Sequence, residues 1–532
     1  MAFKDLRSSI EDLKRRDLLF SIDRLIDKDS ELMPLVRWQY RGLAEAERRG
    51  FLFTNVTDGR GRTYDASVAV AVLGASRRVY AAALGCPVAE LRDRWIRAAA
   101  SPITPVVIKS AGAPVKEEIH GPDEVGREGF GLDEFPVPIS TPGYDPAPFV
   151  TSGHWVTKDL ETGVRNVGNY RGHVKAPNRL GLQLFPTQHE GIHWLKRRER
   201  GQDLEAAIVI GAPPTVAMTA VAKLPYGVDE YAVAGALSGE PIELVRCETV
   251  DLEVPAHAEI VIEGRIPTRY LEPEAPFGEF TGFVGERTLH PCFEVTCVTH
   301  RRRPIWQAFI SQFPPSESTM IRAISNEAAY YNLLKNHCNV PSVIDIVFHE
   351  SAGALNMMVI RLKKRSPAQP TQALLAAAAL EPTYGKILIA VDEDIDPYDL
   401  DAVMWACSTR MQPHLDVTII RNRASMLDPS AAPPDAPREQ QFFPEPRGAS
   451  AMLIDATRKW NYPPISLPKE EFMERARRIW EDEKLPALSP KTPWFGYPLG
   501  PWPAEWEEEA DVAVKGRYYE TGEKLAKQRV NH

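Results

Sequence analysis

Two glutamates lie five residues apart in the segment Pro-Glu-Ala-Pro-Phe-Gly-Glu-Phe-Thr-Gly-Phe at residues 273–283. The prolines and glycine of this segment exclude a regular helix, so Glu274 and Glu279 are held on irregular backbone. Carboxylates fixed in separate surroundings suit general acid–base chemistry, because the environment of each sets its own pKa. An exposed turn with two solvated glutamates explains the same pattern, since exposed glutamates are common.

A second set of polar residues has the donor types of a metal site. Asn166 belongs to the run Asn-Val-Gly-Asn-Tyr-Arg that ends at Arg171, and His189 and Glu230 each lie near the start of an expected helix. Together, Asn, His and Glu suit a divalent cation, whereas singly each is explained as a turn or helix-start residue. Asn166 and Arg171 would point to opposite faces of a regular strand, and a bulge at Gly168 would bring them to one side.

Residues 189–193 read His-Glu-Gly-Ile-His and match the H-E-x-x-H pattern of zinc hydrolases. That chemistry needs both histidines on one face of a continuous helix, which Gly191 weakens. Lys196 and Glu199 occupy the positions where the extended form of the motif requires glycine and histidine. A zinc-dependent hydrolase is therefore kept as an alternative function.

The composition describes a globular protein without a nucleic-acid or membrane partner. The 532 residues include 44% hydrophobic and 25% charged residues, a length that predicts roughly three to four domains. A net charge of −9 argues against nucleic acid as a partner. The apolar run at 373–380 is too short to span a membrane, and we expect no secretory signal at the N-terminus. Six scattered cysteines without a C-x-x-C motif predict reduced thiols and a cytoplasmic location.

The first half of the chain changes from mixed to β-rich patterns. Leu6, Ile10 and Leu13 have helical spacing, and the apolar positions from 66 to 84 predict a buried helix. Residues 112–148 are rich in Pro, Gly and acidic residues and predict a long connecting loop. The following region predicts a hairpin with strands at 152–156 and 165–174, a helix at 188–200, and strands within 250–266 and 293–310.

The second half returns to α/β alternation and ends in a tail. Helices are expected at 318–335 and 370–380, and strands at 343–348 and 386–391. The acidic run at 392–396 lacks EF-hand spacing and predicts a strand-end turn. Beyond residue 420 the pattern is Pro-rich and irregular, with one helix near 469–482 and a segment rich in Trp at 493–506.

Distinctive segments lie at 229–237 (Asp-Glu-Tyr-Ala-Val-Ala-Gly-Ala-Leu), 254–264, 273–279 and 454–460. Together they resemble the UbiD-like decarboxylases, which use prenylated flavin mononucleotide (prenylated FMN). The resemblance runs from the N-terminal helix to about residue 465. It implies a multidomain α+β and α/β fold, with a β-rich, split-barrel-like flavin-binding domain between an N-terminal α/β domain and a C-terminal α/β domain that mediates oligomerisation. The expected boundaries are 1–115, 116–317 and 318–465, followed by a helix and extended tail at 466–532.

The resemblance also implies a role for each candidate site residue. Arg171, Glu274 and Glu279 match the catalytic Glu-Arg-Glu network of the family. Asn166, His189 and Glu230 match the ligands that hold Mn²⁺ (or Mg²⁺), with K⁺ nearby, against the flavin phosphate. Ile321 and Ile324 match positions on the substrate side. The cofactor-binding positions are Thr151, Asn166, Gly168, Asn169, Tyr170, Arg171, Gln188, His189, Lys223, Leu224, Pro225 and Glu230.

The implied activity is a reversible, non-oxidative decarboxylation of an aromatic or α,β-unsaturated acid, either free or as a coenzyme A thioester. Arg171, supported by Glu274, would orient the carboxylate, and Glu279 would deliver the proton that replaces CO₂. A general acid needs a raised pKa, so Glu279 is expected in the drier environment of the two. Gln312 and Phe313 replace a Gly-Arg pair found in some relatives, which leaves the substrate open.

The resemblance further implies a homodimer or homohexamer and a separate flavin prenyltransferase that supplies the cofactor. A catalytically degenerate flavin-binding scaffold is the non-enzymatic alternative, and the intact Glu-Arg-Glu set argues against it.

Overall fold

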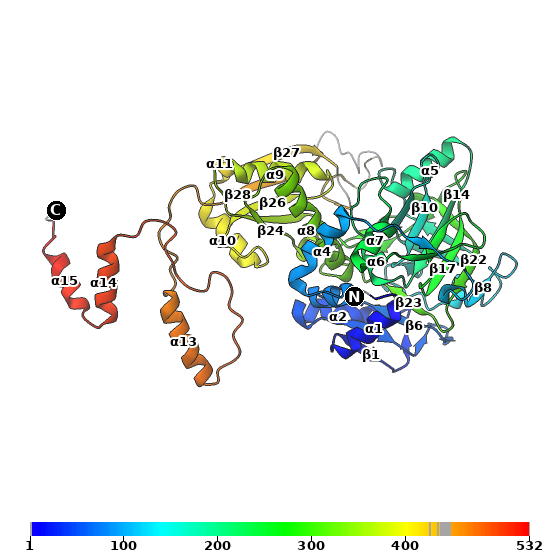
Figure 1. The fold of residues 1–532 in the computed structure, drawn as a ribbon, viewed down its shortest axis with the longest axis horizontal. Helices are drawn as coiled ribbons and strands as arrows, with labels where there is room; N and C mark the ends of the chain where they lie inside the picture. Colours follow the sequence, from blue (N-terminus) through cyan, green and yellow to red (C-terminus); the bar gives the residue numbers. More distant parts are fainter. Residues whose placement is uncertain (1–2, 425–426, 434–435, 437–447, 531–532) are drawn as a thin grey trace.

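The N-terminal region packs four helices around a four-stranded sheet (Figure 1). The computed structural model describes residues 3–424, 427–433, 436 and 448–530. The apolar stretch from 66 to 84, expected as one helix, is instead a buried strand followed by a helix, because Ser76 caps a new helix with its side chain. The sheet has the order β1 (Leu19–Ile22), β3 (Gly50–Phe53), β6 (Ser67–Val70) and β23 (Ile305–Ala308). The helices are α1 (Leu6–Arg15), α2 (Leu32–Gly42), α3 (Arg77–Leu84) and α4 (Leu91–Ala100), and a small sheet joins β2 (Ile26–Asp27), β4 (Val56–Thr57) and β5 (Thr63–Tyr64).

A nine-stranded, antiparallel sheet forms the middle of the molecule. The expected hairpin is present as β10 (His154–Lys158) and β11 (Arg165–Asn169), but its second strand ends at Asn169 rather than continuing to Val174. The chain turns at Tyr170 and Arg171 and enters a separate strand. In path order the strands are β11, β10, β14 (Leu204–Ile210), β17 (Ile260–Ile266), β22 (Cys292–His300), β13 (Arg179–Leu182), β12 (Gly172–Ala176) and β9 (Phe149–Val150), and β8 (Glu118–His120) pairs with β22.

This sheet curls until its two ends meet. β11 and β12 lie near opposite ends of the path, yet only two residues join them. Three residues likewise join β9, at one end, to β10. Such short links force the ends together, because two or three residues span about 7–10 Å. The result agrees with the β-rich middle domain expected from the sequence.

Helices and short strands surround the curled sheet. The expected helix at 188–200 is α5, which crosses the face of the sheet near β10 and β14. The segment at 112–148, expected as a loop, contains β8 and contributes buried Leu132, Phe135 and Val137 to the core. The other elements are α5 (His189–Glu199), α6 (Pro214–Thr219), α7 (Glu230–Ser238), β7 (Val106–Val107), β15 (Glu243–Arg246), β16 (Glu253–Pro255), β18 (Glu272–Glu274), β19 (Phe277–Gly278), β20 (Val284–Gly285) and β21 (Thr288–His290).

The C-terminal domain is a five-stranded sheet covered by helices (Figure 1). The helices and strands expected between 318 and 391 are all present, and the acidic run at 392–396 follows a strand as expected. The stretch after residue 420 was expected to be irregular, but it contains a strand that lies inside the sheet; part of that stretch is outside the described residues. The elements are α8 (Glu317–Asn332), α9 (Gln369–Leu380), α10 (Leu400–Arg410) and α11 (Pro413–Asp416), with sheet order β24 (Val343–Phe348), β25 (Met357–Leu362), β26 (Ile387–Asp392), β28 (Ala449–Ala456) and β27 (Val417–Arg423).

The tail extends away from the domains and is more helical than expected (Figure 1). The expected helix is α13 (Glu470–Asp482), and two further helices follow, α14 (Ala504–Val514) and α15 (Tyr518–Ala526). None of the three buries a residue, and Trp502 and Trp506 remain 39% and 52% exposed. These tryptophans are therefore only partly covered by the rest of their own chain.

Candidate active site

Arg171 occupies the two-residue link between β11 and β12, where the ends of the curled sheet meet. The bulge expected at Gly168 is absent, because the register between β10 and β11 is regular. What sends Arg171 inward is the end of the strand one residue earlier, at Asn169. Gly168 serves another purpose, since a Cβ there would lie within 2.7 Å of the Tyr170 ring. The small residue thus lets Tyr170 fold back over the strand.

Arg171 forms hydrogen bonds with both glutamates of the segment 273–283. Its Nε and Nη2 donate to the two carboxylate oxygens of Glu274 at 2.8 and 2.7 Å, a bidentate pair. Its Nη1 donates to Oε1 of Glu279. All three side chains are buried, so these bonds are made away from bulk water. Residues separated by more than a hundred positions therefore form one charged cluster.

The two carboxylates are not equivalent. Burial raises the pKa of Glu279, and this effect outweighs the opposing charge of Arg171. Glu279 is 7% exposed and Glu274 is fully buried. The expectation that Glu279 lies in the drier environment is therefore wrong in terms of exposure. Its pKa is raised chiefly by burial, because Arg171, which makes its bidentate pair with Glu274, does not offset that effect.

Short strands and a neighbouring segment fix the loop that carries the glutamates. Glu274 ends β18, and β19 follows, with Ala275 between them at a φ of 79°. A non-glycine residue at positive φ costs about 1 kcal/mol or more and persists only where the surroundings hold it. Asp145 helps to fix the backbone of this loop, because its Oδ1 accepts a hydrogen bond from the backbone N–H of Gly278 at 3.2 Å.

Asp145 and Arg322 belong to this cluster, and the sequence reasoning missed both. Burial raises the pKa of Asp145 to about 6, and its charge acts on both Arg171 and Glu279. Arg322, on α8, stacks over the Phe280 ring with 3.7 Å between Cζ and the ring centroid. Burial lowers the pKa of Arg322, partly offset by the charges of Tyr384 and Glu279. The available signal for Arg322 was an arginine between two buried isoleucines of one helix.

The three candidate metal ligands converge on β11. Asn166 lies within this strand and lines a small cavity together with His189, the first residue of α5. Glu230, the first residue of α7, accepts a hydrogen bond from the backbone N–H of Val167 at 2.8 Å. Burial raises the pKa of Glu230 to about 8, and among the described residues no Lys or Arg pairs with it. A buried carboxylate without a cation next to amide and imidazole donors fits a divalent ion.

The other candidate cofactor residues lie around the same end of the sheet. The carbonyl of Thr151 accepts from Asn169 at 3.2 Å, and its hydroxyl accepts from the backbone of Phe309 at 2.9 Å. Gln188 accepts from the backbone N–H of Phe185 at 3.0 Å, and Lys223 forms an ion pair with Glu381 at 3.3 Å. Leu224 packs against the core, and the carbonyl of Pro225 accepts from the backbone of Val228.

Ile321 and Ile324, the expected substrate-side residues, are buried on α8 within the main core. Ile321 packs against Gly74 of the N-terminal region, because a Cβ at that glycine would lie 2.7 Å from it. On the same helix, Arg322 is the side chain whose charge acts on Glu279.

Comparison with known proteins identifies the family. The family described as 3-octaprenyl-4-hydroxybenzoate carboxy-lyase Rift-related domain matches residues 106–314, and the corresponding C-terminal domain matches 319–456. The chain belongs to the UbiD family of carboxy-lyases. A protein of Synechocystis sp. with 30% identity covers 93% of this chain and 96% of its own length. A protein of Archaeoglobus fulgidus with 31% identity covers 70% of this chain and 75% of its own.

Solved UbiD-class structures share the fold across nearly the whole chain. HmfF from Pelotomaculum thermopropionicum, in complex with prenylated FMN (prFMN), has a TM-score of 0.75 and 31% identity, covering 90% of this chain and 100% of its own. Vanillic acid decarboxylase from Sedimentibacter hydroxybenzoicus has a TM-score of 0.75 and 27% identity, with the same coverage. The 3,4-dihydroxybenzoic acid decarboxylase AroY from Klebsiella pneumoniae has a TM-score of 0.74 and 28% identity, covering 86% of this chain and 95% of its own.

The H-E-x-x-H segment of this UbiD-family chain keeps its histidine spacing on one helix, but its glutamate is buried. His189 and His193 do lie on one continuous helix, although Gly191 was expected to weaken it. Glu190, which would have to activate water, is fully buried, and burial raises its pKa well above the usual value. His193 instead contacts Thr157 at 2.9 Å. No observation therefore favours zinc hydrolysis.

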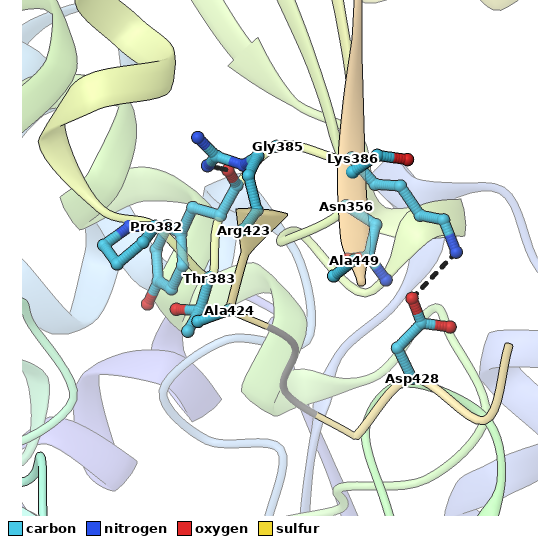
Figure 2. Close-up of a pocket in the computed structure, with 11 residues that line it drawn as sticks. Asn356, Pro382, Thr383, Gly385, Lys386, Arg423, Ala424, Asp428 and Ala449 are labelled. Atoms are coloured by element: carbon cyan, nitrogen blue, oxygen red, sulfur yellow. Dashed lines mark hydrogen bonds and ion pairs between the residues drawn. The ribbon is translucent and has the colours of Figure 1, made fainter. Parts of the chain in front are cut away.

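A second hollow lies on the C-terminal domain (Figure 2). Asn356, Lys386, Arg423 and Asp428 line it, and Lys386 pairs with Asp428 at 2.7 Å. Its lining includes none of the family's catalytic positions.

Among the described helices, none is both long and apolar enough to cross a membrane.

Proposed function

We propose that this chain is a prenylated-FMN-dependent, non-oxidative and reversible decarboxylase of an aromatic or α,β-unsaturated acid. The observation that carries the proposal is the buried cluster in which Arg171 is held by both Glu274 and Glu279. The family assignment supports the reaction class, and the cluster supports a division of labour among these residues. Arg171 binds the substrate carboxylate, Glu274 positions Arg171, and Glu279 transfers the proton.

Arg171 keeps donors for a substrate after binding both glutamates. A guanidinium has five N–H donors. Glu274 accepts from Nε and Nη2, and Glu279 accepts from Nη1, so one N–H remains on each terminal nitrogen. Two such parallel donors match the two oxygens of a carboxylate. The bidentate bond to Glu274 fixes the guanidinium plane, which orients the substrate before reaction.

Glu279 suits the proton transfer because its acid form is favoured. Loss of CO₂ leaves an electron pair on carbon, and a proton must replace the lost carboxyl group. The raised pKa of Glu279 keeps the carboxyl protonated at higher pH than an exposed glutamate. After donating its proton, the Glu279 carboxylate is stabilised by the hydrogen bond from Arg171. In the carboxylation direction the same group accepts the proton.

The residues at the meeting ends of the sheet fit the proposed cofactor and cations. Prenylated FMN, when bound, supplies an electrophilic centre that accepts the electron pair released with CO₂. Asn166, His189 and Glu230 would hold Mn²⁺ (or Mg²⁺) against its phosphate, with K⁺ nearby, because Glu230 is a buried carboxylate without a cation of its own. Thr151, Gln188 and the loop 223–225 would surround the cofactor.

The substrate class follows from the relatives and from the charges of the site. Solved relatives act on vanillic acid and 3,4-dihydroxybenzoic acid, which supports an aromatic acid for this chain. Ile321 and Ile324 would form the apolar side of the substrate pocket. A free acid and a coenzyme A thioester of a larger acid both fit this proposal, and an activity panel separates them.

The remaining expectations concern partners and location. We infer a homodimer or homohexamer and a separate flavin prenyltransferase that supplies the cofactor, as the family resemblance implies. We expect a cytoplasmic location because free cysteines are typical of a reducing compartment, and all six thiols are unpaired. Each of these expectations stays a prediction.

Co-expression with a flavin prenyltransferase tests the proposal. The purified chain should retain prenylated FMN and a divalent metal, seen by absorbance, mass spectrometry and metal analysis. It should then release CO₂ from at least one member of a panel of aromatic and unsaturated acids. A chain that never retained the cofactor would contradict the proposal. A chain that retained it but turned over no acid, and catalysed no exchange of CO₂, would instead be a flavin-binding scaffold.

A further inference from the structure

Three side chains outside the candidate active site converge on one point beside the curled sheet. They are His120 at the end of β8, Glu134 at the end of a single helical turn, and His300 at the end of β22. β8 pairs with β22 so that His120 lies opposite Val298, which makes His300 its diagonal neighbour on the same face. Glu134 reaches the two histidines from the segment that connects β8 to the rest of the domain.

The distances within this cluster match the edges of a metal coordination shell. Nε2 of His120 and Nε2 of His300 are 3.2 Å apart. Oε2 of Glu134 is 3.4 Å from Nε2 of His120, and its Oε1 is 3.0 Å from Nε2 of His300. Ligands about 2.0–2.1 Å from a tetrahedral zinc ion are about 3.3 Å from one another. All three separations are close to that value.

A hydrogen bond behind His300 orients its lone pair toward the centre of the cluster. Nδ1 of His300 is 2.9 Å from the carbonyl oxygen of Arg301, which can only accept, so Nδ1 carries the proton. In neutral His300 the lone pair therefore lies on Nε2 and faces the Glu134 carboxylate. Nδ1 of His120 has Glu124 as its acidic neighbour at 3.7 Å. An acceptor behind each ligating histidine is the usual arrangement around a bound metal.

The surroundings of the cluster are apolar and partly closed. His300 is 5% exposed, and the ring of Phe135 packs edge-on against it at 5.4 Å between centroids. The Phe130 ring packs against His120 at 5.0 Å. Oε2 of Glu134 is buried and accepts no hydrogen bond. Two imidazole nitrogens and a carboxylate oxygen thus face one another in a partly enclosed site, an arrangement that a proton or a metal ion between them stabilises.

We propose that His120, Glu134 and His300 bind a zinc ion that ties the segment 118–135 to the end of β22. Two neutral imidazoles and one carboxylate are zinc ligands, and a water molecule completes the tetrahedral shell. The metal takes the place between the two Nε2 atoms and the Glu134 carboxylate, which bind it through their lone pairs. The site is distinct from Asn166, His189 and Glu230 and does not depend on the proposed decarboxylase activity.

Metal stoichiometry in the full-length chain tests this site. The protein is stripped with a chelator, equilibrated with zinc, desalted and analysed for metal. His300→Gln should lose one zinc ion per chain relative to the native sequence, whereas His189→Gln should retain the zinc bound at this cluster. His257→Gln is a matched control, because His257 pairs with a single carboxylate, Glu243, at 2.8 Å. This control should bind as much zinc as the native chain.

Spectroscopy and crystallography supply the second readout. Cobalt should give tetrahedral absorption bands in the native and His189→Gln chains and lose them in His300→Gln. Equal zinc content in the native and His300→Gln chains would overturn the proposal, and the cluster would then be a proton-sharing pair of histidines. If His300→Gln does not fold, anomalous scattering at the zinc edge from crystals of the native chain decides. An anomalous peak between the three side chains supports the site, and its absence from zinc-soaked crystals overturns it.

Discussion

Two buried arginines in this protein are each held by two carboxylates, yet their surroundings differ. Arg171 binds Glu274 and Glu279 in the middle domain. Arg410 binds Asp392 at 3.0 Å and Asp394 at 2.6 Å in the C-terminal domain. Arg410 is 1% exposed and Arg171 is 9% exposed, so burial alone does not separate them.

The number of cations around each pair of carboxylates makes the difference. Asp392 also pairs with Arg458 at 3.3 Å and with Lys364 at 3.9 Å. Burial would raise the pKa of Asp394, but the hydrogen bonds and charge of Arg410 outweigh it and lower the pKa. Around Arg171, the effect of burial on the carboxylate pKa outweighs the effect of the nearby cations. Glu274 and Asp145 add negative charge, and burial raises the pKa of Glu279.

This comparison indicates how one set of residue types serves two purposes. With Arg410 and Arg458 nearby, the pKa of Asp394 is lowered, and the cluster links strands and helices. Around Arg171, burial outweighs the charges of Arg171 and Arg322, so the protonated form of Glu279 is favoured and a group that can release a proton results. The ratio of charges, rather than the presence of an arginine and two acids, distinguishes the clusters.

The largest expected effect is loss of turnover in Glu279→Gln. The amide preserves shape but has no proton to transfer, so kcat should fall about 10²- to 10⁴-fold. The free energy of unfolding should change by less than about 1 kcal/mol, because an amide costs less to bury than a carboxylate. Steady-state kinetics and urea titration measure both. Asp394→Asn is the matched control and should reverse the pattern, with lower stability and unchanged turnover per folded molecule. Unchanged kcat in Glu279→Gln would remove the proposed acid.

The next effect is on stability, in Arg410→Leu. Removing this arginine leaves Asp392 and Asp394 buried with fewer cations, which should cost about 3–5 kcal/mol. Chemical denaturation followed by circular dichroism measures the change. Turnover per folded molecule should remain as in the native chain, since Arg410 is in the C-terminal domain. A loss of stability below about 1 kcal/mol would show that the two clusters do not differ as proposed.

A moderate effect is expected on the pH dependence of kcat and of stability. The pKa of Glu279 is raised, so its acid form persists above the usual glutamate range, and decarboxylation should decline as pH rises through that pKa. Asp394 has a lowered pKa, so its stabilising effect is present above the unfolded value and is lost as pH falls through the folded one. Asp145→Asn removes a negative charge and should move the alkaline decline of kcat to lower pH. A decline at the same pH in the native and Asp145→Asn chains would contradict this coupling.

The smallest effect is expected for an exposed pair with the same contact distance. Lys386 and Asp428 are 2.7 Å apart, as are Nη2 of Arg171 and Oε2 of Glu274, but the Lys386 side chain is 42% exposed (Figure 2). Lys386→Met should change the free energy of unfolding by about 0–1 kcal/mol, because water and salt screen the pair. Thermal melts at low and high salt provide the measurement. A loss above about 2 kcal/mol would show that the contact distance of an ion pair, rather than its exposure to solvent, determines its contribution to stability.

Much of the architecture followed from local pattern. The helices at 318–335, 370–380 and 469–482 and the strand at 343–348 agree with α8, α9, α13 and β24. The errors arose where tertiary contacts override local preference. In the apolar stretch 66–84, Ser76 was a local signal for a helix start. The residues before it form β6 because they pair with β3 and with the distant β23.

The candidate site also has features that local sequence predicts and features that depend on tertiary contacts. The irregular backbone around Glu274 and Glu279 was predictable, because proline and glycine act locally. The position of Arg171 was not predictable. Strand β11 ends at Asn169 without a bulge at Gly168, and where it ends depends on where the curled sheet closes. Asp145 was missed because nothing near it in the chain indicates that it acts on Glu279. The local feature at Arg322, its place between Ile321 and Ile324, does not identify Glu279 as its neighbour.

The sequence by itself determined which residue types are available and in what order, and this was sufficient for the family, the reaction class and most elements. The tertiary structure alone decided that Glu274 takes the bidentate position on Arg171 and that Glu279, with one hydrogen bond from that arginine, has the raised pKa. The physical reason is that a pKa depends on burial and on every charge within a few ångströms. Those neighbours come from segments far apart in the chain, so only the folded protein brings them together.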